Sequence, residues 1–396
     1  MTSQRILGAT VLAASITVMV ALGVCGVGHG GETHLDTPIL YAAGEYWQAG
    51  GSAYTRNVVP HVSGAIGDTL DRYTFAYPPQ SAPLFLLLAI GSAETANTIM
   101  TIFNLVSLAA LAYLTVRLAE PDDSEMQHWI IPALVIGNLS TVFVVWMGQT
   151  TLIMTAALAG AWYYARRGEP IVAGIFLAVA TMKPPLSLFV VAWFVLEREW
   201  KVLGTMTVAI LVMASIPMYQ SGPIQVYLDW LGSLGNYGVH ASNALGSRML
   251  FNLQSLLFAV GITTPSLIVF GLIGTLALWY WRHVFVENDL LGVVLGITLL
   301  FGYGHSYDIA ALVLLIPAFW RRVHDSAAAS AVALTMLFAI SFPNSVLEPY
   351  GSLLLLHARV AVLCVALVWL LWLSADAAPE RGGYSGVQGL SSTASL

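Results

Sequence analysis

Long apolar runs alternate with short polar segments along most of the 396-residue chain. A helix needs about 20 apolar residues to cross the roughly 30 Å hydrocarbon core of a bilayer, and several runs reach or approach this length. The pattern predicts an all-α integral membrane protein with about twelve transmembrane helices. The expected spans are 6–27, 95–117, 129–147, 150–165, 170–182, 184–197, 202–218, 263–281, 289–304, 309–320, 326–342 and 353–373.

Basic residues give this scheme an orientation, because arginine and lysine gather in cytoplasmic loops. With these spans all basic clusters fall on one side, and both termini are expected in the cytoplasm. The scheme requires that "YPPQSAPLFLLLAIG", residues 77–91, does not cross; its three prolines favour a re-entrant or tilted element. The basic markers are Arg5, Arg117, Arg166 with Arg167, Arg198 with Lys201, Arg282, and Arg321 with Arg322.

The domain organisation follows from the same pattern. Residues 1–375 are predicted to form a single polytopic membrane domain, whose long first extracytoplasmic loop contains juxtamembrane helices. The tail 376–396 is rich in glycine and serine and lacks periodicity, which predicts a disordered cytoplasmic tail. The long first loop has no equal in the second half of the chain, which weighs against an inverted-repeat transporter.

Composition supports the membrane assignment and excludes several activities. Hydrophobic residues make up 58% of the chain and charged residues only 9%, so the net charge of -6 comes from few groups. No basic stripe indicates nucleic acid. The sequence has no HExxH, no acid pair on the predicted outer face, no nucleophile elbow and no Walker loop, so neither a metal nor a nucleotide cofactor is expected.

Polar and charged residues collect on the predicted outer face, whereas the cytoplasmic face has no comparable set. Such residues at membrane depth are costly unless they bind or catalyse. The set indicates a functional site at one membrane surface. Its members are Asp36, Glu45, Tyr77, Gln149, Lys183, Asp229, His240, Arg248, His305, Asp308 and, just inside the last span, Arg359.

Asp36 opens the stretch "DTPILYAAGEYWQAGG". Thr37 suits an N-cap, Pro38 the first helical position, and the Gly50–Gly51 pair the end of the helix. Asp36 then precedes a helix N-terminus, whose dipole favours an ionised carboxylate. The helix is apolar and aromatic enough to lie along the membrane interface. Two interpretations stay open: a capping acid, or a carboxylate that accepts a proton or binds a cation.

Three further positions also allow two interpretations each. Lys183 in "VATMKPPLSLF" lies between two short apolar helices, where an ammonium group either forms a structural ion pair or binds an anionic headgroup. Gln149 in "WMGQTTLI" occupies an outer turn and either satisfies backbone groups or binds a ligand. Asp308 in "GYGHSYDIAALVLLIP" either caps its helix or takes part in the site.

The remaining cations are assigned on charge and position alone. His305 either packs or binds a ligand. Arg359 either snorkels to the interface from the last span or faces the site. Arg248 either is solvated in its loop or binds phosphate.

Several strings, read in order, resemble a known family. They are similar to those of glycosyltransferase family 87 in the GT-C superfamily, the polyprenol-phosphate-mannose-dependent mannosyltransferases, and they cover residues 36 to about 317. The matching strings are "DTPILYAAGEYWQAGGSAY", "FAYPP", "GQTTLI", "LAVATMKPPLSLFV" ending in "LEREWK", "NLQSLL" and "GHSYDIAALVLLIP".

The resemblance implies a GT-C-type fold in the plasma (inner) membrane with an extracytoplasmic active site. It implies inverting transfer of a sugar, mannose for most such enzymes, from a polyprenyl-phosphate-linked donor to a hydroxyl of a glycolipid or cell-envelope glycan, without an obligatory metal. Asp36 would be the general base, Lys183 would face the lipid phosphate and His305 would line the site. Tyr41 and Tyr77 would pack against the sugar or prenyl chain, or simply pack in the core.

A lipid-linked sugar transporter or flippase is the main alternative, and a non-catalytic scaffold a second. A transporter should carry polar groups near the membrane midplane, reachable from both faces, whereas the charged set here lies at one face. The loops 55–75 and 220–248 match no motif. The sequence therefore leaves open the acceptor, the sugar, the linkage and the oligomeric state.

Overall fold

A computed structural model describes residues 3–54, 75–119, 126–238, 243–323, 326–342 and 351–376. Within these ranges the regular structure is helical and contains no strand; an isolated antiparallel bridge joins Leu250 to His305. This confirms the all-α prediction. Residues 55–74, His240 and 377–396, which include most of the loop 55–75 and nearly all of the predicted tail, lie outside the described residues.

The described helices follow one another closely, with few long connections. In the first half they are α1 (Ser3–Val18), the π-helical turn η1 (Met19–Val24), α2 (Thr37–Gln48), the 3₁₀ turn η2 (Pro79–Ser81), α4 (Ala82–Leu88), α5 (Ala93–Leu118), α6 (Gln127–Ile136), α7 (Leu139–Met147), α8 (Thr151–Arg166), α9 (Pro170–Ala180) and α10 (Pro184–Leu196). In the second half they are α11 (Trp200–Met213), α12 (Ser215–Ser221), α13 (Gln225–Tyr237), α14 (Leu253–Ala259), α15 (Ile268–Tyr280), the 3₁₀ turn η3 (Arg282–Val284), α16 (Glu287–Phe301), the 3₁₀ helix η4 (Ser306–Leu315), α17 (Ile316–Val323), α18 (Ala327–Ser341) and α20 (Leu353–Asp376).

Each of the twelve ranges predicted to span coincides with a helix or with two consecutive helices. Of the described helices, three are long and apolar enough to cross a membrane: Gln4–Val24, Ala93–Leu118 and Leu353–Leu373. Two bent pairs, α6–α7 with 47° and α11–α12 with 54°, raise this number to five if each pair is one span. The chain is therefore an integral membrane protein, and the count of twelve crossings stays a prediction.

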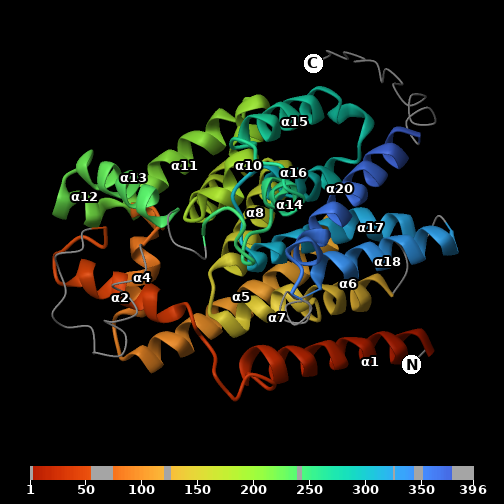
Figure 1. Ribbon diagram of the computed structural model, residues 1–396, viewed down its shortest axis with the longest axis horizontal. Coiled ribbons are helices and arrows are strands. Elements are labelled where there is room, and N and C mark those ends of the chain that lie inside the picture. Colours follow the sequence, from red (N-terminus) through yellow and green to blue (C-terminus); the bar gives the residue numbers. More distant parts are fainter. Residues whose placement is uncertain are drawn as a thin grey trace, which may run out of the picture.

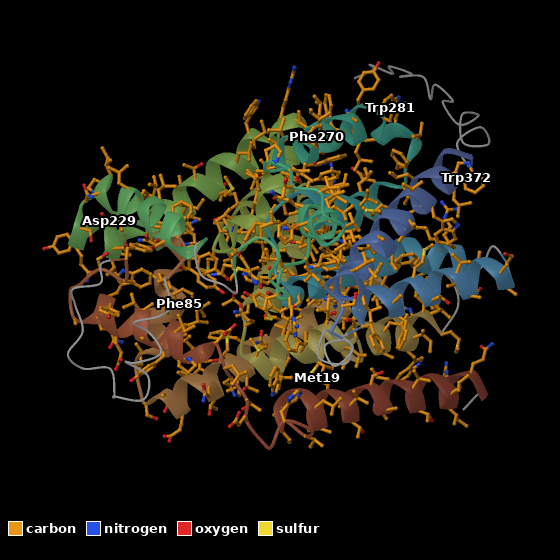
Figure 2. All side chains as sticks on the ribbon, in the orientation of Figure 1. Met19, Phe85, Asp229, Phe270, Trp281 and Trp372 are labelled. Carbon is orange, nitrogen blue, oxygen red and sulfur yellow. The ribbon has the colours of Figure 1, made fainter. Side chains whose placement is uncertain are left out.

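Large apolar side chains cover much of the outside of the helix bundle. Figure 2 labels Phe270, Trp281 and Trp372 at the surface, and each exposes more than half of its area. Contiguous exposed apolar surface of this kind is typical of helices that face lipid. The main core lies inside the bundle, between α5, α8, α10, α16, η4, α17 and α20.

A second, aromatic core lies at the end of the molecule where α2, α4, α12 and α13 gather, at the left of Figure 1. The Trp47 ring stacks on Phe85 at 6.3 Å between centroids, and Phe75 meets Phe85 edge-on at 5.5 Å. Gly44 allows α2 to touch α4, because a Cβ atom at this position would collide with the carbonyl of Phe85. This close approach holds α2 against α4.

The predicted re-entrant segment 77–91 forms η2 and α4. Together these two elements, Pro79–Leu88, rise about 15 Å at 1.5 Å per residue, half of a hydrocarbon core. They pack against α2 and α5 at the same end of the bundle. The segment is thus too short to cross a bilayer as a straight helix, and its re-entrant course stays a prediction.

The basic residues expected in the cytoplasm gather at the opposite end of the helices. Arg166, at the end of α8, pairs with Glu197 at 2.6 Å, and Arg282 reaches the same carboxylate at 3.3 Å. Arg321, at the end of α17, pairs with Asp289 at the start of α16 and donates to the carbonyl of Ala119 after α5. Ion pairs therefore join the end of α8 to the end of α10 and the end of α17 to the start of α16, and a hydrogen bond joins α17 to the end of α5.

Candidate active site

Four helices begin at one place, and their N-cap residues are candidate site residues or their direct neighbours. Asp36 is the N-cap of α2, Thr150 of α8, Lys183 of α10 and His305 of η4. Side-chain hydrogen bonds join these four starting points, as described below. The structure thus brings together segments that are more than 100 residues apart in sequence.

Asp36 is fixed by the backbone around it. Its N–H donates to the carbonyl of Met147 at 3.0 Å, and the N–H of His34 donates to Trp146 at 2.7 Å, so this segment pairs with the end of α7. Gly148 has a left-handed backbone (φ 68°), and a Cβ atom there would collide with the hydroxyl of Thr37. The prediction that Thr37 is the N-cap is wrong by one residue, because Asp36 holds that position.

The Asp36 carboxylate does not cap its own helix. It makes no side-chain cap bond and accepts a hydrogen bond from the amide nitrogen of Gln149. Burial raises the pKa of Asp36 above its usual value, while the bond from Gln149 and the charge of Lys183 act in the opposite direction. A buried carboxylate with a raised pKa is a stronger base than a solvated one.

Gln149 is held by Tyr77 and Thr150. Its side-chain oxygen accepts from the Tyr77 hydroxyl at 3.1 Å and from the Thr150 N–H at 3.3 Å, so its amide nitrogen must face Asp36. The Tyr77 and Thr150 hydroxyls are 2.8 Å apart. Tyr77 is in turn fixed through its carbonyl, which accepts from Tyr54 at 2.9 Å.

Lys183 forms a buried ion pair with Asp308, which is the structural interpretation of this lysine. Its ammonium also donates to the hydroxyl of Thr151 at 2.8 Å and lies 4.5 Å from the centre of the Tyr307 ring. Thr151 donates to the same Asp308 oxygen at 2.9 Å. The second oxygen of Asp308 accepts from the N–H of His305 at 2.9 Å, so Asp308 caps η4 as well.

His305 is buried among three tyrosines. Its Nε2 atom lies 3.0 Å from the Tyr237 hydroxyl and 3.3 Å from that of Tyr303, and its ring stacks on Tyr307 at 5.0 Å. Its Nδ1 atom is buried without a hydrogen-bond partner. Burial lowers the pKa of His305 to about 4, so the imidazole is neutral at physiological pH.

The three other predicted site residues lie farther from this cluster. The Tyr41 hydroxyl donates to Glu45 at 2.8 Å and to the carbonyl of Gly91 at 3.1 Å, on the side of α2 that faces the start of α5. Arg359 is buried in α20, where it donates to the carbonyl of Phe342 at 2.6 Å and lies over the Phe251 ring. Arg248 is exposed, two residues before the Leu250–His305 bridge.

Sequence reasoning missed Thr150, Thr151, Tyr237 and Tyr303. Consecutive hydroxyls directly after Gln149, at a predicted helix start, could have indicated the two threonines. Tyr237 lies in the loop 220–248 that matched no motif, and no local signal links it to His305.

The electrostatics of the cluster favour an anion. Each helix N-terminus is equivalent to about half a positive charge. Four N-termini together with Lys183 therefore exceed the two negative charges of Asp36 and Asp308. Such a region attracts phosphate groups. Among the described residues, no group of three histidine, cysteine, aspartate or glutamate side chains is placed to hold a metal ion.

Comparison with known proteins assigns the family. The family model of glycosyltransferase family 87 matches residues 75–303, more than half of the chain. The chain belongs to glycosyltransferase family 87. No curated protein and no solved structure matches it.

Membership of family 87, together with the apolar helices, makes this protein a membrane glycosyltransferase, which acts on a sugar donor and an acceptor. The matched range contains Tyr77, Gln149 and Lys183, whereas Asp36 precedes it and His305 follows it. The contacts described above join all five positions in one cluster.

Proposed function

We propose that this family 87 protein transfers a mannosyl group from a polyprenyl-phosphate-linked donor to a hydroxyl of a glycolipid or cell-envelope glycan. The observation that carries the proposal is the juxtaposition of a basic carboxylate, Asp36, with a positively charged region formed by Lys183 and four helix N-termini. A base and an anion site side by side suit transfer from a sugar phosphate to an alcohol.

Asp36 acts as the general base. The acceptor hydroxyl loses its proton to the Asp36 carboxylate while its oxygen forms the new bond to the anomeric carbon. The bond between that carbon and the phosphate oxygen breaks on the opposite face, so the configuration is inverted. Gln149 holds the carboxylate in place through its amide nitrogen, and Tyr77 holds Gln149.

The electron pair of the broken bond leaves with the polyprenyl phosphate, which gains negative charge. The helix N-termini and Lys183 stabilise this charge, and Asp308 and Thr151 keep the ammonium in position. The phosphate group can leave as an anion without being protonated, so the reaction needs no general acid in addition to the base Asp36. The proposal includes no obligatory metal and no cofactor.

The other candidate residues are assigned to binding. His305 offers its Nδ1 atom to the donor. The Arg359 guanidinium lies over the Phe251 ring, and Arg248 lies two residues before the Leu250–His305 bridge. Each of these cations adds to the positive electrostatic potential at the site. Tyr41 supports the packing of α2 and reaches substrate only by its ring.

The proposal includes twelve membrane crossings, with segment 77–91 re-entrant and residues 1–375 forming one domain. Two observations support a one-sided arrangement. Thr151 at the start of α8 belongs to the site cluster, whereas Arg166 at its other end belongs to the ion pairs of the basic end, about 22 Å away along the helix axis. We infer that the basic end is cytoplasmic, with both termini, and that the site opens at the extracytoplasmic face of the plasma membrane.

The test uses purified protein in lipid vesicles with radiolabelled donors. We expect transfer from polyprenyl-phosphate-mannose to an extracted envelope-lipid fraction, unchanged by a chelator and at least tenfold faster than from the glucose or arabinose donor. Faster transfer from another sugar would overturn the mannosyl assignment alone. Loss of transfer on chelation would overturn the metal-independent mechanism.

A lipid-linked sugar transporter is not favoured, because the charged cluster lies at one end of the helices and not midway along them. The same vesicles distinguish the two functions. Movement of labelled donor across the bilayer without formation of a new glycoside would contradict the proposed enzyme.

A further inference from the structure

Helix α13 (Gln225–Tyr237) presents three different faces along its length. One face lies against the protein: Val226 and Ser233 are buried there, and Trp230 and Tyr237 are half-buried. The opposite face, at a spacing of three or four residues, carries the apolar side chains of Ile224, Leu228 and Leu231. The side between them carries Gln225, Asp229 and Asn236.

The apolar face is open in the structure. Ile224 exposes 73% of its surface, Leu228 54% and Leu231 55%, although none of these side chains gains from contact with water. An exposed apolar stripe flanked by a polar side is typical of a helix that lies in a membrane interface.

The stripe continues an apolar surface that leads into the membrane. On α11, Val208 and Val212 expose 61% and 67% of their surface, and the chain then bends by 54° into α12. On α12, Ile216 and Tyr219 are again exposed, Tyr219 by 92%. Helix α11 forms most of the predicted span 202–218, so its exposed face is expected to contact acyl chains, and the 54° bend turns α12 out of the direction of α11 towards α13.

The buried face of α13 holds two segments of the candidate active site. The indole of Trp230 donates to the carbonyl of Ala76 at 2.9 Å, and the hydroxyl of Ser233 donates to Phe75 at 3.0 Å, directly before Tyr77. At the end of the helix the Tyr237 hydroxyl lies 3.0 Å from Nε2 of His305. These three contacts link the position of α13 to the positions of Tyr77 and His305.

We propose that α12 and α13 lie in the surface of the bilayer at the site end, with Ile224, Leu228 and Leu231 among the phospholipid acyl chains. Asp229, which Figure 2 shows at the outer edge of the molecule, then faces water. The segment has no lysine or arginine between Lys201 and Arg248, so the contact depends on apolar burial and not on anionic headgroups. This position of α12 and α13 in the bilayer surface holds Tyr77 and His305 at the membrane depth at which the headgroup of a lipid-linked acceptor lies.

The test measures the depth of spin labels in phosphatidylcholine nanodiscs. The cysteines Cys25 and Cys364 are both free and are replaced by serine, and single labels are placed at Leu228, at Asn236 as the matched control on the same helix, and at Val212 as a membrane reference. We expect the Leu228 label, like the Val212 label, to be accessible to oxygen and closed to a water-soluble nickel chelate. The Asn236 label should show the reverse.

Three outcomes would overturn the proposal. Equal nickel access at Leu228 and Asn236 would place both faces in water. A Leu228 label shielded from both reagents would show that protein covers the stripe. Strong coupling between Leu228 labels on two molecules would indicate a contact between copies of the chain.

A second measurement rests on the proposed function and tests whether the membrane contact of α13 is needed for transfer. Leu228→Asp and Asn236→Asp introduce the same charge on the two faces. We expect Leu228→Asp to lower transfer to a membrane-bound acceptor several-fold more than Asn236→Asp. Equal losses would contradict the link to the site, whereas absence of transfer in the unmodified protein would refute the enzyme and leave the depth measurement standing.

Discussion

The Asp36 carboxylate accepts a hydrogen bond from Gln149, at the turn between α7 and α8, although Asp36 itself occupies the N-cap of α2. A capping acid would bond the free N–H groups of its own first turn, and this bond is absent. The dipole of α2 still favours the ionised form, while burial raises the pKa. Both properties suit a carboxylate that must accept a proton and release it again.

The pH dependence of transfer follows from these residues. Asp36 must be ionised to act as a base, and burial raises its pKa above 3.8, so kcat/KM should fall on the acid side with a midpoint above 3.8. The pKa of His305 is lowered to about 4, so its charging adds no step above about pH 5. Initial rates between about pH 4 and pH 8 test this, and a flat profile down to about pH 4 would contradict it.

The ion pair of Lys183 and Asp308 makes a prediction about stability. Both side chains are nearly fully buried, with 9% and 2% exposure, so removing one partner leaves an uncompensated charge. Lys183→Met should lower the free energy of unfolding by about 3–5 kcal/mol, and Lys183→Met with Asp308→Leu by less than either single change. Thermal unfolding in detergent measures the three variants. Additive losses would show that the two charges do not depend on each other.

Sequence alone predicts residue types at the site better than their partners. Asp36, Gln149, Lys183 and His305 are polar residues at predicted helix starts, which is a local signal. The bond between Asp36 and Gln149 joins positions 113 residues apart, and the pair of Lys183 with Asp308 joins positions 125 apart. Such pairings depend on how the helices pack, so the sequence left an ion pair and an anion site as two open interpretations of Lys183.

At the scale of elements, the contact of α2 with α4 places the aromatic core beside the site. Gly44 makes it possible, because its α-carbon faces the carbonyl of Phe85 directly. The Tyr54 hydroxyl then reaches the carbonyl of Tyr77 from this core. The position of Tyr77, and through it Gln149, therefore depends on close packing of two short helices.

Gly44→Ala tests this packing against Gly204→Ala, the same change in another helix. The added methyl group at Gly44 must displace α4, which should lower the free energy of unfolding by about 1–3 kcal/mol. Gly204 faces open space, so alanine there should be neutral or stabilise α11 by up to about 1 kcal/mol. Chemical unfolding in detergent compares the two. Equal effects would contradict the close contact of α2 with α4.

Hydrophobic patterning located all twelve predicted helical ranges but not their bends. The ranges 129–147 and 202–218 were each predicted as one helix, and the structure breaks both. In the first, Gly137 ends α6 and the Asn138 side chain caps α7, a local signal that the apolar run conceals. Helix α13 was missed because one of its faces contacts protein and another is apolar and exposed, so its sequence lacks the alternation of a simple surface helix.

At the scale of the whole molecule, charge is divided between two ends. The candidate active site lies where α2, α8, α10 and η4 begin, and the ion pairs of Arg166, Arg282 and Arg321 lie at the other ends of the bundle. The positive-inside rule then predicts an orientation with the site on the outer surface. This division predicts which positions an impermeant reagent can reach in intact cells.

Single cysteines at Asn236 and Glu169 test the orientation, in a protein in which Cys25 and Cys364 are replaced. Asn236 is exposed at the site end, and Glu169 is exposed at the basic end, where it pairs with Arg167 at 3.6 Å. An impermeant maleimide should label Asn236→Cys in intact cells and Glu169→Cys only after the membrane is opened. Labelling of both from the same side would show that the two ends do not lie on opposite faces.

The central claim is that Asp36 is the general base, and replacement of Asp36 tests this claim most directly. The measurement compares kcat and KM for transfer from polyprenyl-phosphate-mannose by the unmodified protein, by Asp36→Asn, and by Asp229→Asn, whose carboxylate on α13 accepts from Gln225 away from the site. Asparagine keeps the size of the side chain and an oxygen for the Gln149 bond. Asp36→Asn should lower kcat about 10²–10⁴-fold with little change in KM for the donor, whereas Asp229→Asn should leave both nearly unchanged. Similar kcat values for the two variants would contradict the assignment of Asp36 as the general base.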